Sequence, residues 1–186
     1  MNVVMATRGF PDQKEEPLLA SLRRGLESHD HVMQTLHLSP HLSDDDLEAH
    51  LGDALLPYTG GAAWVFGGFS LGARIAAQLV ARVPSPHRPA GLLFLGFPFH
   101  HLRKPSEPLG FDHLFNIPQT HTLVIQGALD PYGSKLTLEK KHFPNEVEIS
   151  WIDDANHRFE SKTKDHLEQV SRRALEFVTF IEGQSF

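Results

Sequence analysis

The sequence predicts an α/β fold, with a mostly parallel sheet and helices on both of its faces. Short apolar runs alternate along the chain with longer runs in which apolar residues recur at helical spacing. Several of the short runs are continuously apolar, which is typical of strands in a sheet that is covered on both sides. The chain has 186 residues, which suits one domain, so we expect a single domain over residues 1–186.

Six short segments are predicted to form strands. Three of them are continuous apolar runs, at 62–68, 91–97 and 122–127. The other three are 2–6 and two segments with alternating polarity, 31–38 and 146–153.

Runs with helical periodicity separate these strands. They predict helices at 18–26, 43–56, 71–83 and about 160–182, with one more between the last two strands. Ser43 lies three residues before Asp46, which is the pattern of a capping box at a helix start.

One connection, residues 98–120, is long and holds four prolines. Long loops in compact domains are often functional, but a surface crossover with a short helix near Phe111–Phe115 explains this one equally well. Its aromatic and histidine side chains form either the rim of a binding site or, for the phenylalanines, part of the core; they are Phe99, His100, His101, Phe111 and His113.

Composition excludes several classes of function. The formal net charge of −6 argues against nucleic acid or an anionic membrane as the main partner. The chain has no cysteine, so disulfides, thiolate zinc sites and cysteine nucleophiles are excluded. The 13 histidines show no ligand spacing such as H-E-x-x-H, so no metal is expected. Without a signal-peptide pattern or a long apolar run, we expect a cytoplasmic protein with no membrane span.

The segment Gly68-Phe69-Ser70-Leu71-Gly72 fits the G-x-S-x-G pattern and lies between a predicted strand and a predicted helix. A sharp strand-to-helix turn of this kind presents its serine as a nucleophile, and small residues flank it because larger side chains would collide there. The amide of Leu71 would then face the same space and bind an oxyanion. The alternative is that Ser70 only caps the helix.

A serine nucleophile needs a base and an orienting acid, which follow it in the order acid, then histidine, in this kind of fold. Asp130 comes shortly after the strand at 122–127, with Pro131 and Gly133 marking a turn. His157 follows the strand at 146–153 and precedes the last helix. The carboxyl ends of parallel strands share one edge of a sheet, so we expect Ser70, Asp130 and His157 to meet there.

Three segments around these residues resemble the motifs of a known family. GGFSLGARIAA, LVIQGALDPYG and DDANHRF are similar to the nucleophile, acid and histidine motifs of the α/β-hydrolase superfamily, and more narrowly of a small branch related to the dienelactone hydrolases. The segment LGFPFHHLRKP also resembles that branch, and the resemblance covers nearly the whole chain. It implies a reduced α/β-hydrolase fold of about six strands, without the two leading strands of larger members and without a large lid domain.

In this family the residue after an early His-Gly pair supplies the second oxyanion amide. The matching stretch here is ATRGFPD, in which Arg8 stands where histidine is usual. The resemblance therefore points to the amide of Phe10, with Gly9 as the alternative donor.

The resemblance implies a serine hydrolase that works through an acyl-enzyme and needs no cofactor. An apolar rim formed by the 98–120 loop would suit small or medium acyl esters as substrates. Ser70 would be the nucleophile, His157 the base and Asp130 the acid. Thioesterase and peptidase activities share this chemistry and stay open. The alternative is a non-catalytic interaction or scaffold protein on the same fold.

Overall fold

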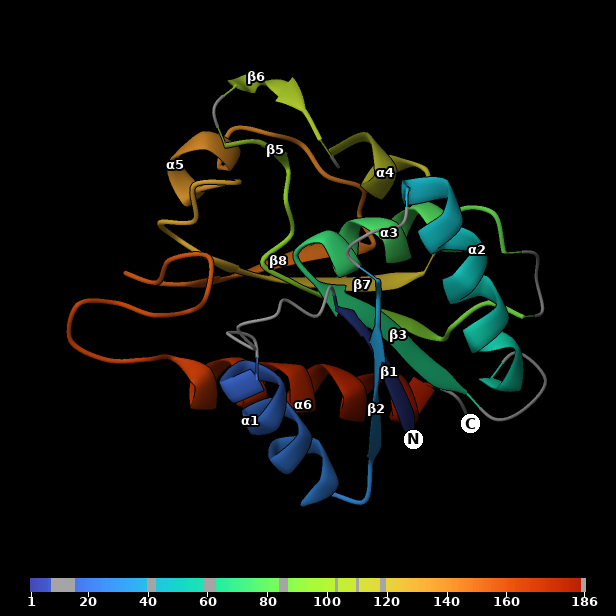
Figure 1. Cartoon of the computed structure of the whole chain (residues 1–186). Helices are drawn as coiled ribbons and strands as arrows, with labels where there is room; N and C mark the ends of the chain where they lie inside the picture. The colour runs from blue at the N-terminus through green and yellow to red at the C-terminus, as the bar shows by residue number, and fades with distance from the viewer. Residues whose placement is uncertain are drawn as a thin grey trace.

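The computed structural model describes residues 1–7, 16–39, 43–58, 63–83, 87–102, 104–109, 111–117 and 120–184. At its centre lies a six-stranded sheet in the order β2-β1-β3-β4-β7-β8, in which every neighbouring pair is parallel (Figure 1). The strands are β1 (Asn2–Thr7), β2 (Val32–His37), β3 (Trp64–Phe69), β4 (Gly91–Leu95), β7 (His121–Gly127) and β8 (Val147–Ile152). The predicted six strands and their parallel pairing are confirmed.

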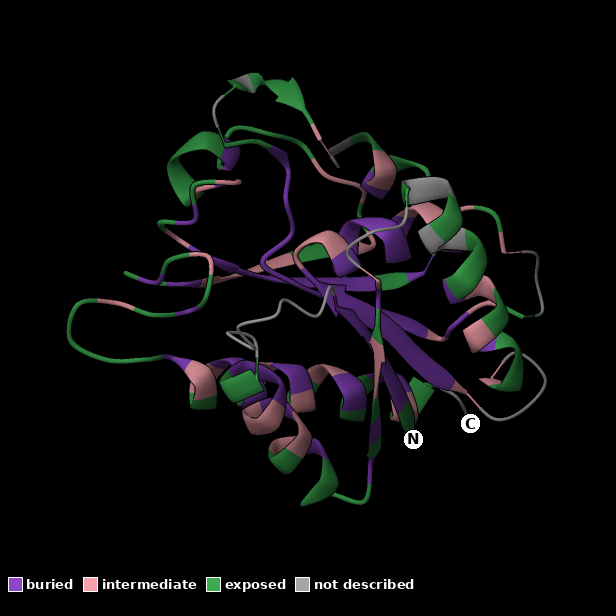
Figure 2. Cartoon of the chain, viewed as in Figure 1, coloured by how far each residue is buried: buried purple, intermediate pink, exposed green. Residues whose placement is uncertain are grey.

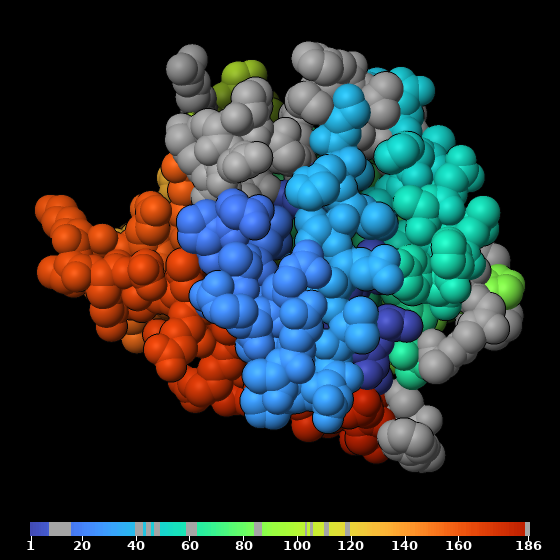
Figure 3. Space-filling view, turned by 60° about the horizontal axis from the view of Figure 1, so that its bottom comes forward, coloured from blue at the N-terminus to red at the C-terminus, as the bar shows by residue number. Residues whose placement is uncertain are grey.

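Helices cover both faces of the sheet. On one face lie α1 (Glu16–Glu27) and α6 (Leu167–Gln184), and on the other lie α2 (Asp44–Leu55) and α3 (Leu71–Val80) (Figure 1). Figure 3 shows α1 on the surface of the first face, with the C-terminal segment alongside it. Ser43 caps α2 as predicted, because its hydroxyl accepts a hydrogen bond from the amide of Asp46 at 3.2 Å.

The central strands β3 and β4 have continuously apolar sequences because both of their faces are buried (Figure 2). In β4, Leu93 and Leu95 belong to the core beneath α1 and α6, while Leu92 and Phe94 belong to the core beneath α2 and α3. Successive side chains on a strand point to opposite faces, so two packed faces require apolar residues at every position.

The long connection after β4 is more structured than a loop. It contains an antiparallel hairpin of β5 (His100–His101) and β6 (Lys104–Pro108), followed by α4 (Phe111–Phe115) at the predicted place. Phe99 is buried in the core rather than on a rim. The remaining short elements are the 3-10 helix η1 (Leu56–Tyr58) and α5 (Lys135–Leu138). The described connections between strands contain no lid domain, as expected.

Two helix boundaries differ from the prediction by three residues or more. The last helix begins at Leu167 instead of about residue 160, because the preceding residues form a loop closed by a bridge between Glu160 and Asp165. α3 ends at Val80, and turn hydrogen bonds to Leu79 and Val80 replace its predicted last residues. None of the helices in the described ranges is long and apolar enough to span a membrane.

His31 makes stability depend on pH. It is 4% exposed, and burial, together with the nearby N-terminal ammonium group, lowers the pKa of His31 from its usual 6.5. The unfolded chain therefore binds a proton at this residue more readily than the folded chain does. Above pH 6.5, where His31 is neutral in both states, this residue does not reduce the free energy of unfolding. As the pH falls from 6.5 through the lowered pKa of the folded state, protonation of the unfolded chain lowers that free energy.

We expect His31→Gln to weaken this loss. Urea unfolding at a series of pH values measures it, as the slope of the unfolding free energy against pH below 6.5. The slope should be smaller in the variant than in the wild type. Equal slopes would show that His31 does not contribute.

Candidate active site

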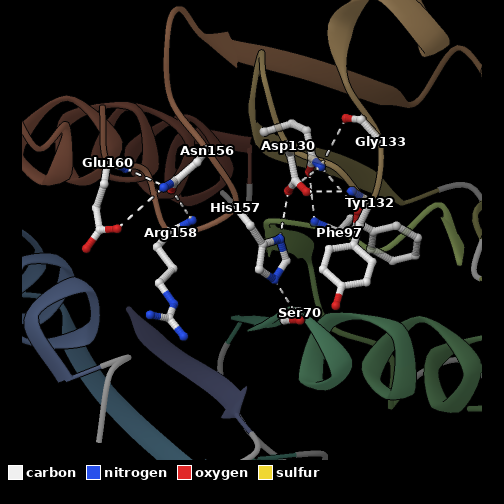
Figure 4. Close-up of polar contacts among 10 residues, drawn as sticks. Ser70, Phe97, Asp130, Tyr132, Gly133, Asn156, His157, Arg158 and Glu160 are labelled. Atoms are coloured by element: carbon white, nitrogen blue, oxygen red, sulfur yellow. Dashed lines mark hydrogen bonds and ion pairs between the residues drawn. The ribbon is translucent and has the colours of Figure 1, made fainter. Parts of the chain in front are cut away.

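The structure brings Ser70, Asp130 and His157 together at the carboxyl edge of the sheet (Figure 4). Ser70 directly follows β3, Asp130 follows β7 and His157 follows β8. Nε2 of His157 lies 3.0 Å from Oγ of Ser70, and Nδ1 of His157 lies 2.7 Å from Oδ2 of Asp130. The imidazole therefore bridges the hydroxyl and the carboxylate.

Ser70 occupies a strained turn between β3 and α3. Its φ of 54° and ψ of −118° are rare for a residue with a side chain. Within the described part of the chain, its side chain makes no capping hydrogen bond to α3, so the interpretation of Ser70 as a simple helix cap is not supported. The hydroxyl instead points to His157 (Figure 4).

Two glycines let this turn lie against the end of β1. A Cβ atom at Gly72 would lie 2.1 Å from the carbonyl oxygen of Ala6, and one at Gly68 would lie 2.6 Å from the same atom. Both distances are far too short for any side chain. The glycines of the G-x-S-x-G pattern are therefore required by backbone packing around Ser70.

The amide of Leu71 lies in the first turn of α3, where backbone N–H groups have no partner within the helix. It directly follows Ser70 and is available to an anion at that place. The predicted second donor Phe10, its alternative Gly9 and the neighbouring Arg8 lie outside the described residues.

Aromatic rings hold the imidazole of His157 on two sides. The ring centroid of Phe69 lies 5.2 Å from that of His157, and the centroid of Tyr132 lies 4.8 Å away. The histidine side chain is 19% exposed, so one part of it stays open to the surface. The two rings limit the rotation of the imidazole and leave part of it exposed.

Asp130 is fully buried, and its carboxylate accepts hydrogen bonds from three groups. The amide of Tyr132 donates to Oδ1 at 2.8 Å, while the side-chain amide of Gln126 and Nδ1 of His157 share Oδ2. A carboxylate can only accept, so Nδ1 of His157 carries a proton. In the neutral ring, Nε2 then presents its lone pair to the hydroxyl of Ser70.

Gln126 is a residue of the site that the motifs did not identify. It lies in β7, is fully buried, and donates from Nε2 to Oδ2 of Asp130 at 2.8 Å. Its Oε1 accepts from the amide of Phe97 at 2.8 Å, and its Nε2 also reaches the carbonyl oxygen of Gly133 at 3.3 Å. Gln126 thus connects Asp130, the turn that follows Asp130 and the segment after β4 through hydrogen bonds. In the sequence, the sign that could have identified Gln126 is that it is the one amide side chain in the apolar run TLVIQG.

The loop that carries His157 is shaped by Asn156. Its side-chain oxygen accepts from the amides of Arg158 at 2.8 Å and Glu160 at 3.1 Å (Figure 4). Such a side-chain turn fixes the backbone on both sides of the histidine without a helix or strand. The amide of Leu129 donates to the carbonyl of Ala155 at 2.9 Å, which joins this loop to the acid turn.

We expect Gln126→Leu to lower the free energy of unfolding by about 2–3 kcal/mol, because it leaves the buried amide of Phe97 and one carboxylate bond of Asp130 without a partner. Urea denaturation measures the change. Gln78→Leu is the matched control, since the Oε1 of Gln78 is buried with no partner among the described residues. It should change stability by less than about 0.5 kcal/mol. Equal effects of the two substitutions would contradict the role of Gln126.

Nothing in the described residues suggests a metal centre. No group of three or more histidine, aspartate or glutamate side chains is placed there to hold an ion.

The fold is that of the α/β hydrolases. A hydrolase from Xanthomonas campestris pv. campestris, described as belonging to the α/β superfamily, superposes with a TM-score of 0.70 at 18% identity, covering 96% of this chain and 98% of that one. A serine hydrolase involved in carbazole degradation gives a TM-score of 0.69 at 12% identity, covering 97% and 91%. The esterase domain of a Rhodothermus marinus protein gives 0.65 at 12% identity, covering 95% and 85%.

The family profile described as "Alpha/beta hydrolase domain" matches residues 39–182, and the chain belongs to this family. A search of curated protein sequences gives no match.

Proposed function

We propose that the protein is a serine hydrolase that cleaves carboxylic esters of small or medium acyl groups. The observation that carries the proposal is the bridging position of His157, with Nε2 at 3.0 Å from the hydroxyl of Ser70 and Nδ1 at 2.7 Å from the buried carboxylate of Asp130. A serine hydroxyl becomes a nucleophile when a base takes its proton, and an oriented neutral imidazole is such a base.

The first half of the reaction forms an acyl-enzyme. Oγ of Ser70 attacks the acyl carbon while Nε2 of His157 takes the hydroxyl proton, and the carbonyl electron pair moves to its oxygen. Asp130 stabilises the resulting imidazolium. The amides of Leu71 and Phe10 hold the oxyanion. When the carbonyl re-forms, the C–O bond to the alcohol breaks, and His157 gives its proton to the departing oxygen.

The second half releases the acid. A water molecule takes the place of the alcohol and loses a proton to His157 as it attacks the acyl carbon. The bond to Oγ then breaks, and the proton returns to Ser70. Every proton transfer uses one imidazole, so the reaction consumes only the ester and water, and no cofactor enters it.

Esters are the substrate class that we propose, because two of the similar structures are described as a serine hydrolase and an esterase domain. The test compares the release of p-nitrophenol from its acetate, butyrate and palmitate esters. We expect turnover of the acetate and butyrate and little of the palmitate. A folded protein that turns over none of these esters would favour the non-catalytic alternative.

A further inference from the structure

Tyr132 is a side chain of the candidate active site to which the proposed reaction gives no chemical role. The centroid of its ring lies 4.8 Å from that of His157. Figure 4 shows the two rings side by side, with the hydroxyl end of Tyr132 directed toward Ser70. The residue is partly exposed, and its hydroxyl is bonded to none of the described residues. This hydroxyl is therefore available to a molecule that binds at Ser70.

The backbone that carries this ring is fixed at both of its polar groups. The amide of Tyr132 donates to Oδ1 of Asp130 at 2.8 Å. Its carbonyl oxygen accepts from the amides of Phe99 at 2.9 Å and His100 at 3.2 Å. Pro131 precedes it and restricts the chain further. The hydroxyl is thus placed before a substrate binds, which is the condition under which a hydrogen-bond donor is most effective in a reaction.

The order of the strands shows on which side of Ser70 this hydroxyl lies. Ser70 follows β3, and in the sheet β1 lies on one side of β3 while β4 and β7 lie on the other. Phe10, the predicted second oxyanion donor, comes after β1 in the chain, whereas Tyr132 comes after β7. The ring of Tyr132 therefore lies on the side of Ser70 away from the end of β1.

The part of an ester that belongs on this side is its alcohol. In the tetrahedral intermediate, the acyl carbon carries Oγ of Ser70, the oxyanion, the acyl chain and the alkoxy oxygen. Nε2 of His157 must lie close to the alkoxy oxygen, because it gives that oxygen a proton. Tyr132 packs against the same imidazole, so the alkoxy oxygen is the reacting atom that its hydroxyl can reach.

We propose that the hydroxyl of Tyr132 donates a hydrogen bond to the alkoxy oxygen of the ester while the alcohol departs. The bonding electron pair of the breaking C–O bond moves to this oxygen, which stays partly negative until His157 delivers its proton. Tyr132 keeps its own proton throughout, so the proton transfers of the reaction are unchanged. The role rests on the proposed ester hydrolysis.

This role also indicates the class of ester that the site is built for. An aliphatic alkoxy oxygen is strongly basic and holds its developing charge on one atom, so a donor stabilises it well. A p-nitrophenolate spreads the same charge over its ring and gains little from a donor. The hydroxyl of Tyr132 therefore favours esters of aliphatic alcohols.

The test compares ethyl butyrate with p-nitrophenyl butyrate, which form the same butyryl-enzyme from different alcohols. Tyr132→Phe keeps the ring beside His157 and removes only the hydroxyl. We expect kcat/KM for the ethyl ester to fall about 10–100-fold in this variant, as for the loss of a hydrogen bond to a charged group. For the p-nitrophenyl ester, the fall should be less than about threefold.

Tyr58→Phe is the matched control, at the one other tyrosine of the chain. The hydroxyl of Tyr58 donates to the side-chain oxygen of Gln34. Its ring packs against Trp64, which begins β3, at the end of that strand opposite to Ser70. Tyr58→Phe should leave kcat/KM unchanged for both esters.

Several results would overturn the proposal for Tyr132. Equal losses for the two esters would mean that Tyr132 only supports the packing of His157, and no loss for either would mean that its hydroxyl takes no part. Wild-type protein that cleaves the p-nitrophenyl ester but not the ethyl ester would overturn this role and leave the proposed serine hydrolase intact. Wild-type protein that cleaves neither ester would overturn both.

Discussion

Replacing Ser70 with glycine should abolish hydrolysis while making the protein more stable. The substitution removes the proposed nucleophile, so kcat/KM for an acyl ester should fall by at least about 10⁴-fold. It also removes the Cβ of a residue held at a φ of 54°. Relief of that strain, less the extra backbone freedom of glycine in the unfolded chain, should raise the free energy of unfolding by about 1 kcal/mol. Ester turnover and urea unfolding measure the two effects.

A serine that caps a helix is the matched control. Ser43→Ala removes the hydroxyl that accepts from the amide of Asp46 at the start of α2. It should cost about 1 kcal/mol of stability and leave ester turnover unchanged. The two substitutions should therefore change stability in opposite directions, and only Ser70→Gly should change ester turnover. Ser70→Gly with near-normal turnover would refute the nucleophile assignment, and a loss of stability in that variant would show that its backbone is not strained.

Asp130→Asn should reduce kcat by about 10⁴-fold. The three donors around Asp130 are Tyr132, Gln126 and His157, and a carboxylate accepts from all of them. Either orientation of an asparagine amide turns its NH₂ group toward at least one of these donors. When that group faces Nδ1 of His157, the ring changes tautomer, and Nε2 then carries a proton and no longer serves as a base.

The same substitution should also lower the free energy of unfolding by about 1–3 kcal/mol. The reason is that the buried NH₂ group of the asparagine then faces another buried hydrogen-bond donor, with no acceptor between them. Asp153→Asn is the control. Asp153 lies on the same loop as His157 and is 88% exposed, and its one ion pair among the described residues is with Lys135 at 3.8 Å. It should leave kcat and stability nearly unchanged. Activity of Asp130→Asn within about tenfold of the wild type would contradict the role of Asp130.

The strands and the meeting of three side chains were predictable because they depend on local patterns. A strand buried on both faces is apolar at nearly every position, so β3, β4 and β7 could be identified in the sequence as continuous apolar runs. The carboxyl ends of parallel strands lie on one edge. The residues that follow β3, β7 and β8 therefore meet, whatever the details of the loops.

Features that depend on tertiary contacts were not predictable in this way. The partners of Gln126 are Phe97, Asp130 and Gly133, which come together only when β4 and β7 pair. The late start of α6 depends on a bridge between Glu160 and Asp165. The hairpin of β5 and β6 is too short to show a period.

Covalent labelling at Ser70 tests the central claim most directly. The folded wild-type protein is treated with a fluorophosphonate, which reacts with an activated serine hydroxyl, and is then digested and mapped by mass spectrometry. We predict one phosphonylated peptide, modified at Ser70, and no labelling of Ser70→Ala. A folded wild-type protein that stays unlabelled at Ser70, or is labelled equally well in the Ser70→Ala variant, would contradict the account.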